Sequence, residues 1–459
     1  MAKKFDAIII GTGQAGPSLA GRLNSEGLKT AVIERKKLGG TCVNTGCTPT
    51  KALVASAHAV HMARRGGDYG FSAGGQITVD MKKVKQRKDE IVRNSNEGLG
   101  KWLESMENAT IFHGQGRFEG PRSVRVNDDL LEADRIFINV GGRAFVPPVA
   151  GLDTVPYFTN STMMEVDFLP QHLLILGGGY IALEFGQMYR RFGSEVTIVQ
   201  RGERLLTSED QDNANAVQEI IEKEGIQICV NTGDYQVENR GGKIAIKMKC
   251  HGKPHEVAGS HLLVATGRTL NTHDLGLDTA GVKTGKGGVI EVDDQLRTSA
   301  EGIWALGDCN GRGAFTHTSY NDYEIVAANL FDNDPRRVSD RIPAYALYTD
   351  PPLGRAGQTE QQVRESGRKA LIGTRPMTKV SRAIEKGETQ GFMKVLVDAE
   401  TKHILGASIL GVGGDEVIHS ILDVMYAKAP YMVIQRAVHI HPTVSELVPT
   451  MLGELKPLG

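Results

Sequence analysis

A short apolar run that enters a glycine-rich turn, then a helix-like segment and a second apolar run, occurs twice in this sequence. This repeat restricts the fold more than any other feature. The first copy spans residues 5–34 and the second spans residues 172–200. In such a βαβ unit the glycines let the backbone approach a pyrophosphate at the N-terminus of the helix. The sequence therefore predicts an α/β protein with two Rossmann-like dinucleotide-binding domains.

The first copy carries an acidic residue at the end of its second apolar run. Its turn contains Gly11, Gly13 and Gly16, and the strand-like residues 30–33 lead into Glu34. An acid about 20 residues beyond the glycines accepts a hydrogen bond from a ribose hydroxyl. A glycine-rich turn alone is weak evidence, but the strand, the helix and the acid together predict a nucleotide site.

The second copy has no acid in the corresponding position. Its glycines and first helical residues are Gly177, Gly179, Tyr180 and Ile181. The position that corresponds to Glu34 is Gln200, with Arg201 and Arg204 close behind. An acid here would repel the 2′-phosphate of NADPH, whereas these side chains offer donors and positive charge. We therefore predict NADPH at the second site, with NADH as the alternative if the two arginines belong only to a solvated loop.

Two cysteines five residues apart, Cys42 and Cys47, follow the first nucleotide pattern. A regular α-helix would separate them by ~7.5 Å along its axis, beyond comfortable disulfide reach, so the backbone must bend between them. Gly46 permits the bend, and Pro49 suits the first turn of a helix. We expect Cys47 at a helix N-terminus, where partial positive charge favours a redox-active thiolate. Two unrelated buried cysteines are the alternative from the spacing alone.

Length and charge narrow the function. At 459 residues the chain exceeds what one hydrophobic core serves, so about three domains are expected. The formal net charge of −1 provides no basic field for nucleic acid or an anionic membrane. With no apolar run of about 18 residues and no signal-peptide pattern, we expect a cytoplasmic protein without a membrane partner. Its five cysteines are too few for a secreted disulfide framework.

Three further strand-like segments end at glycine turns. Residues 134–143 and 261–268 end at turns that include Gly142 and Gly267, as expected where the chain passes between domains. A third buried strand ends at Asp308. This acid is suited to accept from a cofactor's polyol chain, although capping a turn is the ordinary role of such an aspartate.

The pattern changes from about residue 342. Segments that alternate or run apolar there predict antiparallel strands, followed by helices, and hence a C-terminal α+β domain. His441 then precedes a proline and lies five residues before Glu446. Alone, such a histidine is more often a loop residue than a base.

Six motifs in order suggest a family. They are residues 11–16, 42–51, 177–184, 265–268, 307–308 and 441–446. Together they resemble the class I pyridine nucleotide-disulfide oxidoreductases, which include dihydrolipoamide dehydrogenase, glutathione reductase and mercuric reductase. The resemblance spans essentially the whole chain. It implies FAD at the first fingerprint, NAD(P)H at the second and a homodimer built by the C-terminal domain.

The resemblance also implies a division of the chain and further cofactor contacts. The expected parts are an FAD-binding domain (1–145), an NAD(P)H-binding domain (146–270), a central segment that completes the FAD domain (271–341) and an interface domain (342–459). The FAD site is expected to add Gly40, Thr41, Lys51, Gly142 and Asp308 to the glycines and Glu34, and the NADPH site to add Gly267.

Catalytic roles follow from the same resemblance. Cys47 resembles the sulfur next to the flavin, and Cys42 the sulfur that exchanges with substrate. Lys51 and Glu184 resemble an ion pair beside the flavin, where a cation stabilises the reduced, anionic ring.

The terminal histidine gains a role from the same comparison. His441, held by Glu446, resembles the acid/base that lies across the dimer interface from the cysteine pair. The remaining cysteines, Cys229, Cys250 and Cys309, match no redox motif and are expected to be structural. We predict no resident metal site.

The implied function is electron transfer from NADPH through FAD to a Cys42–Cys47 disulfide and on to a disulfide or a metal ion such as Hg(II) or Cu(II). Residues 315–323 and 348–354 look like the mercuric-reductase-like branch, which includes reactive-chlorine-resistance flavoproteins. Mercuric reductases carry a C-terminal cysteine pair, whereas this chain has no cysteine after Cys309, which predicts inefficient mercury turnover.

Two alternatives remain open. The first is a dihydrolipoamide dehydrogenase, which shares the His-Pro-Thr ending but uses NAD and carries an acid where this chain has Gln200. The second is a redox-sensing or scaffold flavoprotein with only incidental NADPH oxidase activity.

Overall fold

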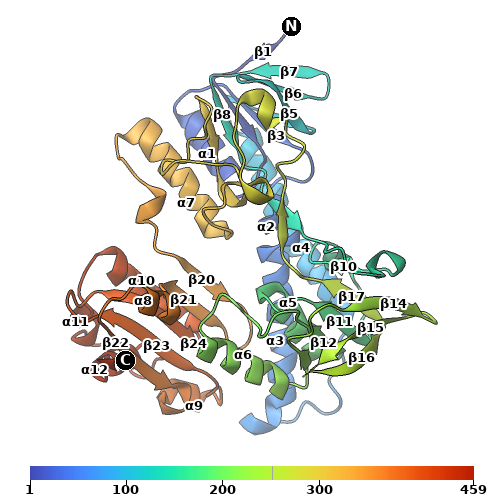
Figure 1. Cartoon of the computed structure of the whole chain (residues 1–459), viewed down its shortest axis with the longest axis vertical. Helices are drawn as coiled ribbons and strands as arrows, with labels where there is room; N and C mark the ends of the chain where they lie inside the picture. Colours follow the sequence, from blue (N-terminus) through green and yellow to red (C-terminus); the bar gives the residue numbers. More distant parts are fainter. Residues whose placement is uncertain (251) are drawn as a thin grey trace.

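The computed structural model describes residues 1–250 and 252–459. Figure 1 shows three parts: an upper part that holds the N-terminus, a lower part in green, and a second lower part in red that holds the C-terminus. A parallel sheet forms the centre of each of the first two parts, and an antiparallel sheet forms the centre of the third. The structure thus confirms the predicted α/β fold, with two Rossmann-like domains and a C-terminal α+β domain.

The upper part is built on a parallel sheet in the order β19-β8-β2-β3-β4. Its strands are β2 (Ala7–Ile10), β3 (Thr30–Glu34), β4 (Ala109–His113), β8 (Arg135–Ile138) and β19 (Ile303–Ala305). Both faces of the sheet are covered, which explains why the sequences of its central strands are continuous apolar runs. The helices on one face are α1 (Ala15–Ser25), α4 (Met81–Glu104) and α7 (Thr316–Ala327).

A second, smaller sheet covers the other face of the upper sheet. Its order is β1-β7-β6-β5, with β1 (Lys3–Lys4), β5 (Gly116–Gly120), β6 (Ser123–Val126) and β7 (Asp129–Glu132). Phe118 and Val124 of this sheet pack against Ile8 and Ile136 of the parallel sheet. The alternation of buried and exposed residues along β5 and β6 follows from this one-sided packing.

The green lower part repeats the same design. Its parallel sheet has the order β10-β17-β11-β12-β13 and consists of β10 (Phe158–Thr159), β11 (His172–Leu176), β12 (Glu195–Val199), β13 (Gln227–Cys229) and β17 (His261–Val264). Helices α5 (Tyr180–Phe192) and α6 (Gln211–Lys223) pack on one face. An antiparallel sheet of β14 (Gln236–Arg240), β15 (Lys243–Cys250) and β16 (Lys253–Gly259) covers the other.

The chain passes between the two parallel sheets at one antiparallel pair, β9 (Gly142–Ala144) with β18 (Arg268–Leu270). After β18 the chain returns to the upper part, where β19 pairs with β8. The upper sheet is therefore made from segments on both sides of the second Rossmann unit.

The red part is a six-stranded antiparallel sheet with helices on it. The order is β20-β21-β24-β23-β22-β25, with β20 (Ala344–Leu347), β21 (Leu353–Gly357), β22 (Ala370–Pro376), β23 (Phe392–Asp398), β24 (Ile404–Leu410) and β25 (Lys456–Pro457). Its helices are α8 (Glu360–Glu365), α9 (Ser381–Glu385), α10 (Gly414–Tyr426), α11 (Met432–Gln435) and α12 (Leu447–Gly453). Helix α10 packs on β21 and β24.

Helices α2 (Gly40–Thr45) and α3 (Cys47–Arg64) lie between the upper and lower parts (Figure 1). Helix α3 packs against α4 and α5. Its N-terminus therefore lies where the first glycine turn and the second Rossmann unit approach each other. Across the described ranges, no helix combines the length and apolarity needed to cross a bilayer.

Candidate active site

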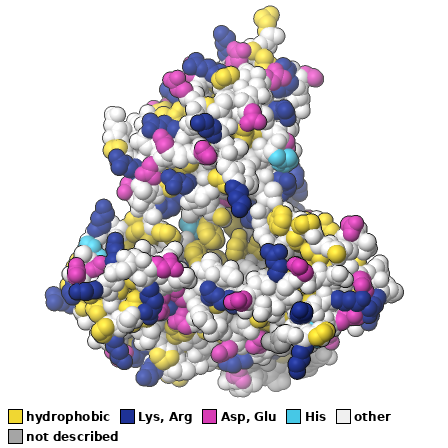
Figure 2. Space-filling view, in the orientation of Figure 1, with side chains coloured by type: hydrophobic (Ala, Val, Ile, Leu, Met, Phe, Trp, Pro, Cys, Tyr) yellow, Lys and Arg dark blue, Asp and Glu magenta, His cyan; other side chains and the backbone are white. Residues whose placement is uncertain are grey.

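A cavity of about 1220 Å³ lies where the upper part meets the two lower parts. Its lining comes from the carboxyl ends of β2 and β3, from α2 and α3, and from the N-terminal ends of α5 and α7. Figure 2 shows the molecule hollowed near the centre of this face, with hydrophobic side chains inside the hollow. Ligands of parallel sheets bind in the crevice outside the carboxyl ends of the strands.

One end of the cavity is formed by the first glycine turn. Gly11 has φ +103°, and a Cβ there would lie 2.4 Å from the Asn139 carbonyl oxygen. The Glu34 carboxylate accepts from the Thr12 N–H at 3.0 Å and from the Thr12 hydroxyl at 2.6 Å, which fixes the turn against the end of β3. A Cβ at Gly16 would lie 2.4 Å from the Gly11 carbonyl oxygen, so Gly16 serves helix packing.

The predicted FAD residues converge on this cavity. Its lining includes Gly11, Gly13, Glu34, Gly40, Thr41, Lys51, Gly142 and Asp308. A narrow backbone cradle at one end, an acid beside it and a long polar and apolar trough fit a dinucleotide. The residues present therefore fit FAD.

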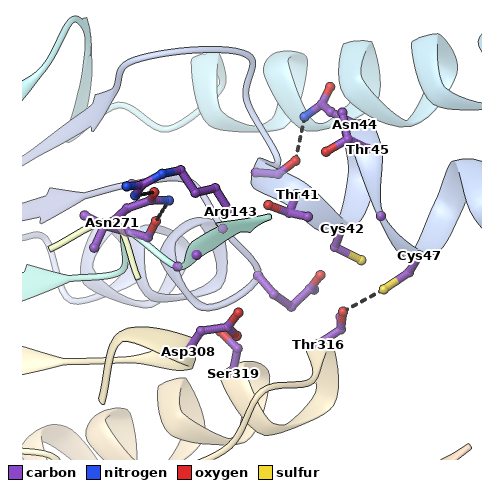
Figure 3. A pocket seen from close by; sticks show the side chains of 18 of the residues that line it. Thr41, Cys42, Asn44, Thr45, Cys47, Arg143, Asn271, Asp308, Thr316 and Ser319 are labelled. Carbon is purple, nitrogen blue, oxygen red and sulfur yellow. Dashed lines mark hydrogen bonds between the residues drawn. The ribbon is translucent and has the colours of Figure 1, made fainter. Parts of the chain in front are cut away.

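The two cysteines line the same cavity. Gly46 separates α2 from α3 with φ −126° and ψ −117°, and a Cβ there would lie 2.8 Å from the Thr41 carbonyl oxygen. The bend lets the side chains of Cys42 and Cys47 face each other as free thiols (Figure 3). Cys47 is the first residue of α3. The dithiol is thus held next to a helix N-terminus, which favours a thiolate.

The two sulfurs have opposite electrostatic environments. The pKa of the Cys47 thiol is lowered to about 6, first because the Cys42 thiol donates a hydrogen bond to its thiolate and next because Thr316 does so too. The Lys51 ammonium adds to this effect, while burial opposes it. The pKa of the Cys42 thiol is raised, first by its interaction with Cys47 and then by burial. Cys47 is therefore the thiolate at neutral pH.

A buried ion pair connects α3 to α5 beside the cysteines. Lys51 Nζ lies 2.7 Å from Glu184 Oε2, and the Glu184 side chain is only 3% exposed. The other oxygen of Glu184 accepts from the Tyr348 N–H at 3.1 Å, and Lys51 Nζ lies 4.4 Å from the centre of the Tyr348 ring. Both members of the pair line the cavity. A fixed cation is thereby held about one helical turn from Cys47.

Thr316 is a site residue that the sequence did not single out. Its hydroxyl lies 3.1 Å from Cys47 Sγ, at the first residue of α7 (Figure 3). It is brought there by the return of the chain to the upper sheet through β19. No local sequence pattern around Thr316 predicts its contact with Cys47.

Replacing Thr316 by valine is expected to raise the pKa of Cys47 by about one unit, because a hydrogen bond to a charged group contributes about 1.5 kcal/mol. The long-wavelength charge-transfer band expected between the Cys47 thiolate and oxidised flavin should then be lost at a higher pH than in the wild type as the solution is acidified. An absorbance titration measures both midpoints. Thr279→Val, which alters an exposed threonine outside the cavity lining, is the control, and equal midpoints for wild type and Thr316→Val would contradict the assignment.

Four further polar residues line the cavity and hydrogen-bond to one another or to its backbone. Arg143 Nη1 donates to Asn271 Oδ1 at 3.0 Å, and Asn271 Nδ2 donates to the Val140 carbonyl oxygen at 3.0 Å (Figure 3). Arg268 Nη2 lies 3.1 Å from Asp308 Oδ2. Asp308 follows β19, as its sequence position predicts, and the pair with Arg268 fixes its orientation.

The second glycine turn repeats the geometry of the first. Gly177 has φ +114°, and a Cβ there would lie 2.3 Å from the Ala265 carbonyl oxygen. Gly179 precedes α5, and a Cβ there would meet nothing within 4 Å, so the space before the helix N-terminus is open. Tyr180 and Ile181 line the main cavity, whereas Gly267 lies in the turn between β17 and β18.

The three polar residues predicted to recognise a 2′-phosphate differ in whether their side chains are already hydrogen-bonded to the loop backbone. Arg201 is exposed to solvent. Arg204 donates to the Glu209 and Thr207 carbonyl oxygens, and Gln200 Nε2 donates to the Arg204 carbonyl oxygen at 3.3 Å. Arg204 thus holds the loop in shape, and Arg201 is the cation available to a ligand.

His441 and Glu446 lie together, away from the cavity. His441 Nδ1 is 2.9 Å from Glu446 Oε2, while the imidazole is 73% exposed. Both residues lie in the segment before α12, and neither belongs to the cavity lining of this chain. An exposed imidazole oriented by a carboxylate is a preformed acid/base that needs a second surface to act on.

Comparison with known proteins agrees with this site. Residues 5–322 match the family described as pyridine nucleotide-disulphide oxidoreductase, and residues 343–452 match the dimerisation domain of that family. The chain is 36% identical over 465 residues to the probable pyridine nucleotide-disulfide oxidoreductase RclA of Escherichia coli (strain K12), which covers 99% of this chain and 100% of that relative. It is 32% identical over 418 residues to a mercuric reductase of Staphylococcus aureus, which covers 91% of this chain and 76% of that relative.

A solved structure shares the whole architecture. The Cu(II) complex of the HOCl-induced flavoprotein disulfide reductase RclA from Escherichia coli superposes with a TM-score of 0.89 at 34% identity, covering 98% of this chain and 100% of that one. The match over both Rossmann units, the dimerisation domain and the cysteine segment confirms the resemblance found in the sequence. The chain therefore belongs to the pyridine nucleotide-disulfide oxidoreductases, a family of flavoprotein enzymes that use FAD and a pyridine nucleotide.

Proposed function

We propose that this protein is an NADPH-dependent flavoprotein that reduces a metal ion, Cu(II) or Hg(II), or a disulfide through Cys42 and Cys47. The observation that supports this most directly is the pairing of a low-pKa Cys47 with a high-pKa Cys42 at the N-terminus of α3. A thiolate and a protonated thiol in contact form a dithiol with two distinct roles.

When bound, FAD supplies the redox group that links a pyridine nucleotide to the cysteine pair. The chain's own residues set the charge around it. The first glycine turn would hold the pyrophosphate and Asp308 would accept from the polyol chain, while Lys51 supplies a cation that Glu184 keeps in place. Thr316 and the α3 N-terminus keep Cys47 as a thiolate.

Cys42 is proposed to meet the acceptor. Its protonated thiol needs a base before it can attack a disulfide or bind a metal, since the thiolate is the reactive form. We assign this proton transfer to His441 of the second protomer in a homodimer, which the dimerisation domain supports. With Cu(II) as acceptor, the thiolate–thiol pair gives one electron to each of two copper ions, forms the Cys42–Cys47 disulfide and releases the one proton carried by Cys42.

The preference for copper and mercury ions rests on the thiols and on the relatives. Thiolate sulfur is a ligand that Cu(I) and Hg(II) prefer. One relative is described as a Cu(II) complex and another as a mercuric reductase. This chain lacks any cysteine after Cys309, so we rank Cu(II) above Hg(II).

A panel of acceptors tests the proposal. The holoenzyme is supplied with NADPH and, in separate assays, Cu(II), Hg(II), glutathione disulfide, lipoamide or a quinone. We expect the fastest Cys42-dependent oxidation of NADPH with Cu(II). Fastest turnover of lipoamide with NADH would instead identify a dihydrolipoamide dehydrogenase. Slow turnover with every acceptor, unchanged in Cys42→Ser, would identify a flavoprotein with a binding or sensing role.

Nucleotide preference is a separate prediction. We expect Gln200→Glu to lower kcat/KM for NADPH by about tenfold or more, because a carboxylate there repels the 2′-phosphate. The value for NADH should stay the same or rise. Steady-state assays with both nucleotides give the ratio, and Gln200→Met separates the loss of a donor from the gain of charge. A wild-type preference for NADH would contradict the assignment.

A further inference from the structure

Two cysteines outside the cavity, Cys229 and Cys250, come into hydrogen-bond contact in the second Rossmann unit. Cys229 ends β13, an edge strand of the parallel sheet, and Cys250 ends β15, the middle strand of the three-stranded sheet. Along β15 the buried residues alternate, which places Cys250 on the same face as Ile244, Ile246 and Met248. Both cysteines belong to the apolar cluster between the two sheets.

The two thiols are in contact and differ in access. Burial, followed by the hydrogen bond with the Cys250 thiol, raises the pKa of the Cys229 thiol to about 12. Cys229 is 5% exposed, whereas Cys250 is half-buried at the end of its strand. A small oxidant therefore meets Cys250 first, and Cys229 is the adjacent thiol that can resolve the product.

The segment that follows Cys229 supports the loop of the second nucleotide site. The Gln200 N–H donates to the Cys229 carbonyl oxygen at 2.8 Å. In return, the N–H and the hydroxyl of Thr232 each lie 3.3 Å from the Gln200 carbonyl oxygen. The Asn231 N–H donates to the Gly202 carbonyl oxygen at 2.7 Å. Residues 229–232 thus fix the backbone of residues 200–202.

We propose that Cys229 and Cys250 form a second disulfide under oxidising conditions, and that this disulfide weakens binding of the pyridine nucleotide beside Gln200. A bond between the sulfurs is shorter than their contact as thiols, so its formation draws the ends of β13 and β15 together and pulls on Cys229. That pull is transmitted to residues 200–202 through the hydrogen bonds described above. The link to the nucleotide rests on the proposed function, whereas disulfide formation does not.

The chemistry is balanced with a peroxide as oxidant. The Cys250 thiolate attacks one oxygen of hydrogen peroxide, the O–O bond breaks, and a sulfenic acid and hydroxide form. The hydroxide takes the proton of Cys229 and becomes water, the Cys229 thiolate attacks the sulfenic sulfur, the S–S bond forms, and hydroxide leaves. The two sulfurs lose two electrons, which the peroxide takes.

Peptide mapping of the holoenzyme tests the disulfide. The protein is treated with hydrogen peroxide, free thiols are alkylated, and a digest without reductant is analysed by mass spectrometry. We expect a linked Cys229–Cys250 peptide, absent in Cys250→Ala. If the protein is first reduced with NADPH under anaerobic conditions and freed of nucleotide, the Cys42–Cys47 linkage reports that the oxidant acted, and Cys309, which is 0% exposed, must stay unlinked and unalkylated in folded protein. A Cys42–Cys47 linkage without a Cys229–Cys250 peptide would overturn the proposal.

Kinetics test the coupling to the nucleotide. After removal of peroxide, the KM for NADPH of the wild type should be at least about fivefold higher, with kcat little changed, and Cys250→Ala should show no such rise. A linked peptide with unchanged KM would overturn the coupling alone. If the enzyme proves to prefer NADH, the same comparison is made with NADH, so a failure of the nucleotide assignment is distinguished from a failure of the disulfide.

Discussion

The Cys47→Ser holoenzyme is expected to lack the long-wavelength charge-transfer band of the two-electron-reduced wild type and to reduce its acceptor about 10³-fold more slowly or worse. The band needs an electron-rich thiolate in the cavity, and the lowered pKa of Cys47, about 6, supplies one at neutral pH. A serine hydroxyl stays protonated and forms no disulfide. Anaerobic titration with NADPH, followed by absorbance, measures the band, and acceptor assays measure turnover.

Cys42→Ser separates the two sulfurs. This variant keeps Cys47, Thr316 and Lys51, so it should retain the band while losing acceptor reduction to a similar extent. Cys250→Ser, which alters a half-buried thiol in the three-stranded sheet outside the cavity lining, controls for a general effect of cysteine replacement. Retention of the band in Cys47→Ser would show that another group provides the thiolate, and the roles of the two cysteines would have to be reassigned.

Replacing His441 by glutamine is expected to lower kcat with the acceptor by about 10²- to 10⁴-fold, the usual contribution of a general acid/base. Glu446 binds Nδ1 of this imidazole, which leaves Nε2 to take a proton from the Cys42 thiol. Reduction of the bound flavin by NADPH precedes that proton transfer, so its rate should be unchanged. Rapid mixing of enzyme with NADPH, compared with steady-state turnover, separates the two half-reactions.

The same segment offers a matched control for His441. His439 lies two residues earlier, and its Nδ1 is 3.3 Å from the Ala437 carbonyl oxygen rather than near a carboxylate. His439→Gln should keep wild-type turnover, and Glu446→Gln should give a smaller loss than His441→Gln, because it disturbs only the orientation of the ring. Equal slowing of flavin reduction in His441→Gln would place the histidine in the first half-reaction instead.

The parts of the fold that the sequence predicts are those that depend on local backbone geometry. Gly11 and Gly177 both adopt positive φ, and at each a Cβ would collide with the carbonyl oxygen of a neighbouring strand, at Asn139 or Ala265. Because only glycine satisfies that requirement, the turn can be recognised from the glycines in the sequence. Gly46 is predictable for a related reason, since the cysteine spacing demands a bend.

Contacts between distant segments leave no such pattern. Thr316 reaches Cys47 only because β19 returns the chain to the upper sheet, and nothing near Thr316 in the sequence reports that return. Lys51 and Glu184 are far apart in the chain, and the family resemblance, not spacing, suggested their pairing. The contact between Cys229 and Cys250 likewise depends on how two sheets stack. Side-chain geometry across elements requires the tertiary structure.

The return of the chain through β19 also bears on how the protein is made. The first sheet gains its fifth strand, and the cavity gains Asp308 and Thr316, only after the entire second Rossmann unit has been synthesised. A nascent chain of residues 1–270 therefore has the first glycine turn but lacks the side of the cavity that carries Asp308 and Thr316. We therefore expect flavin to load only during the last third of translation, and fragments that end before α7 should emerge without bound flavin even when both nucleotide turns are intact.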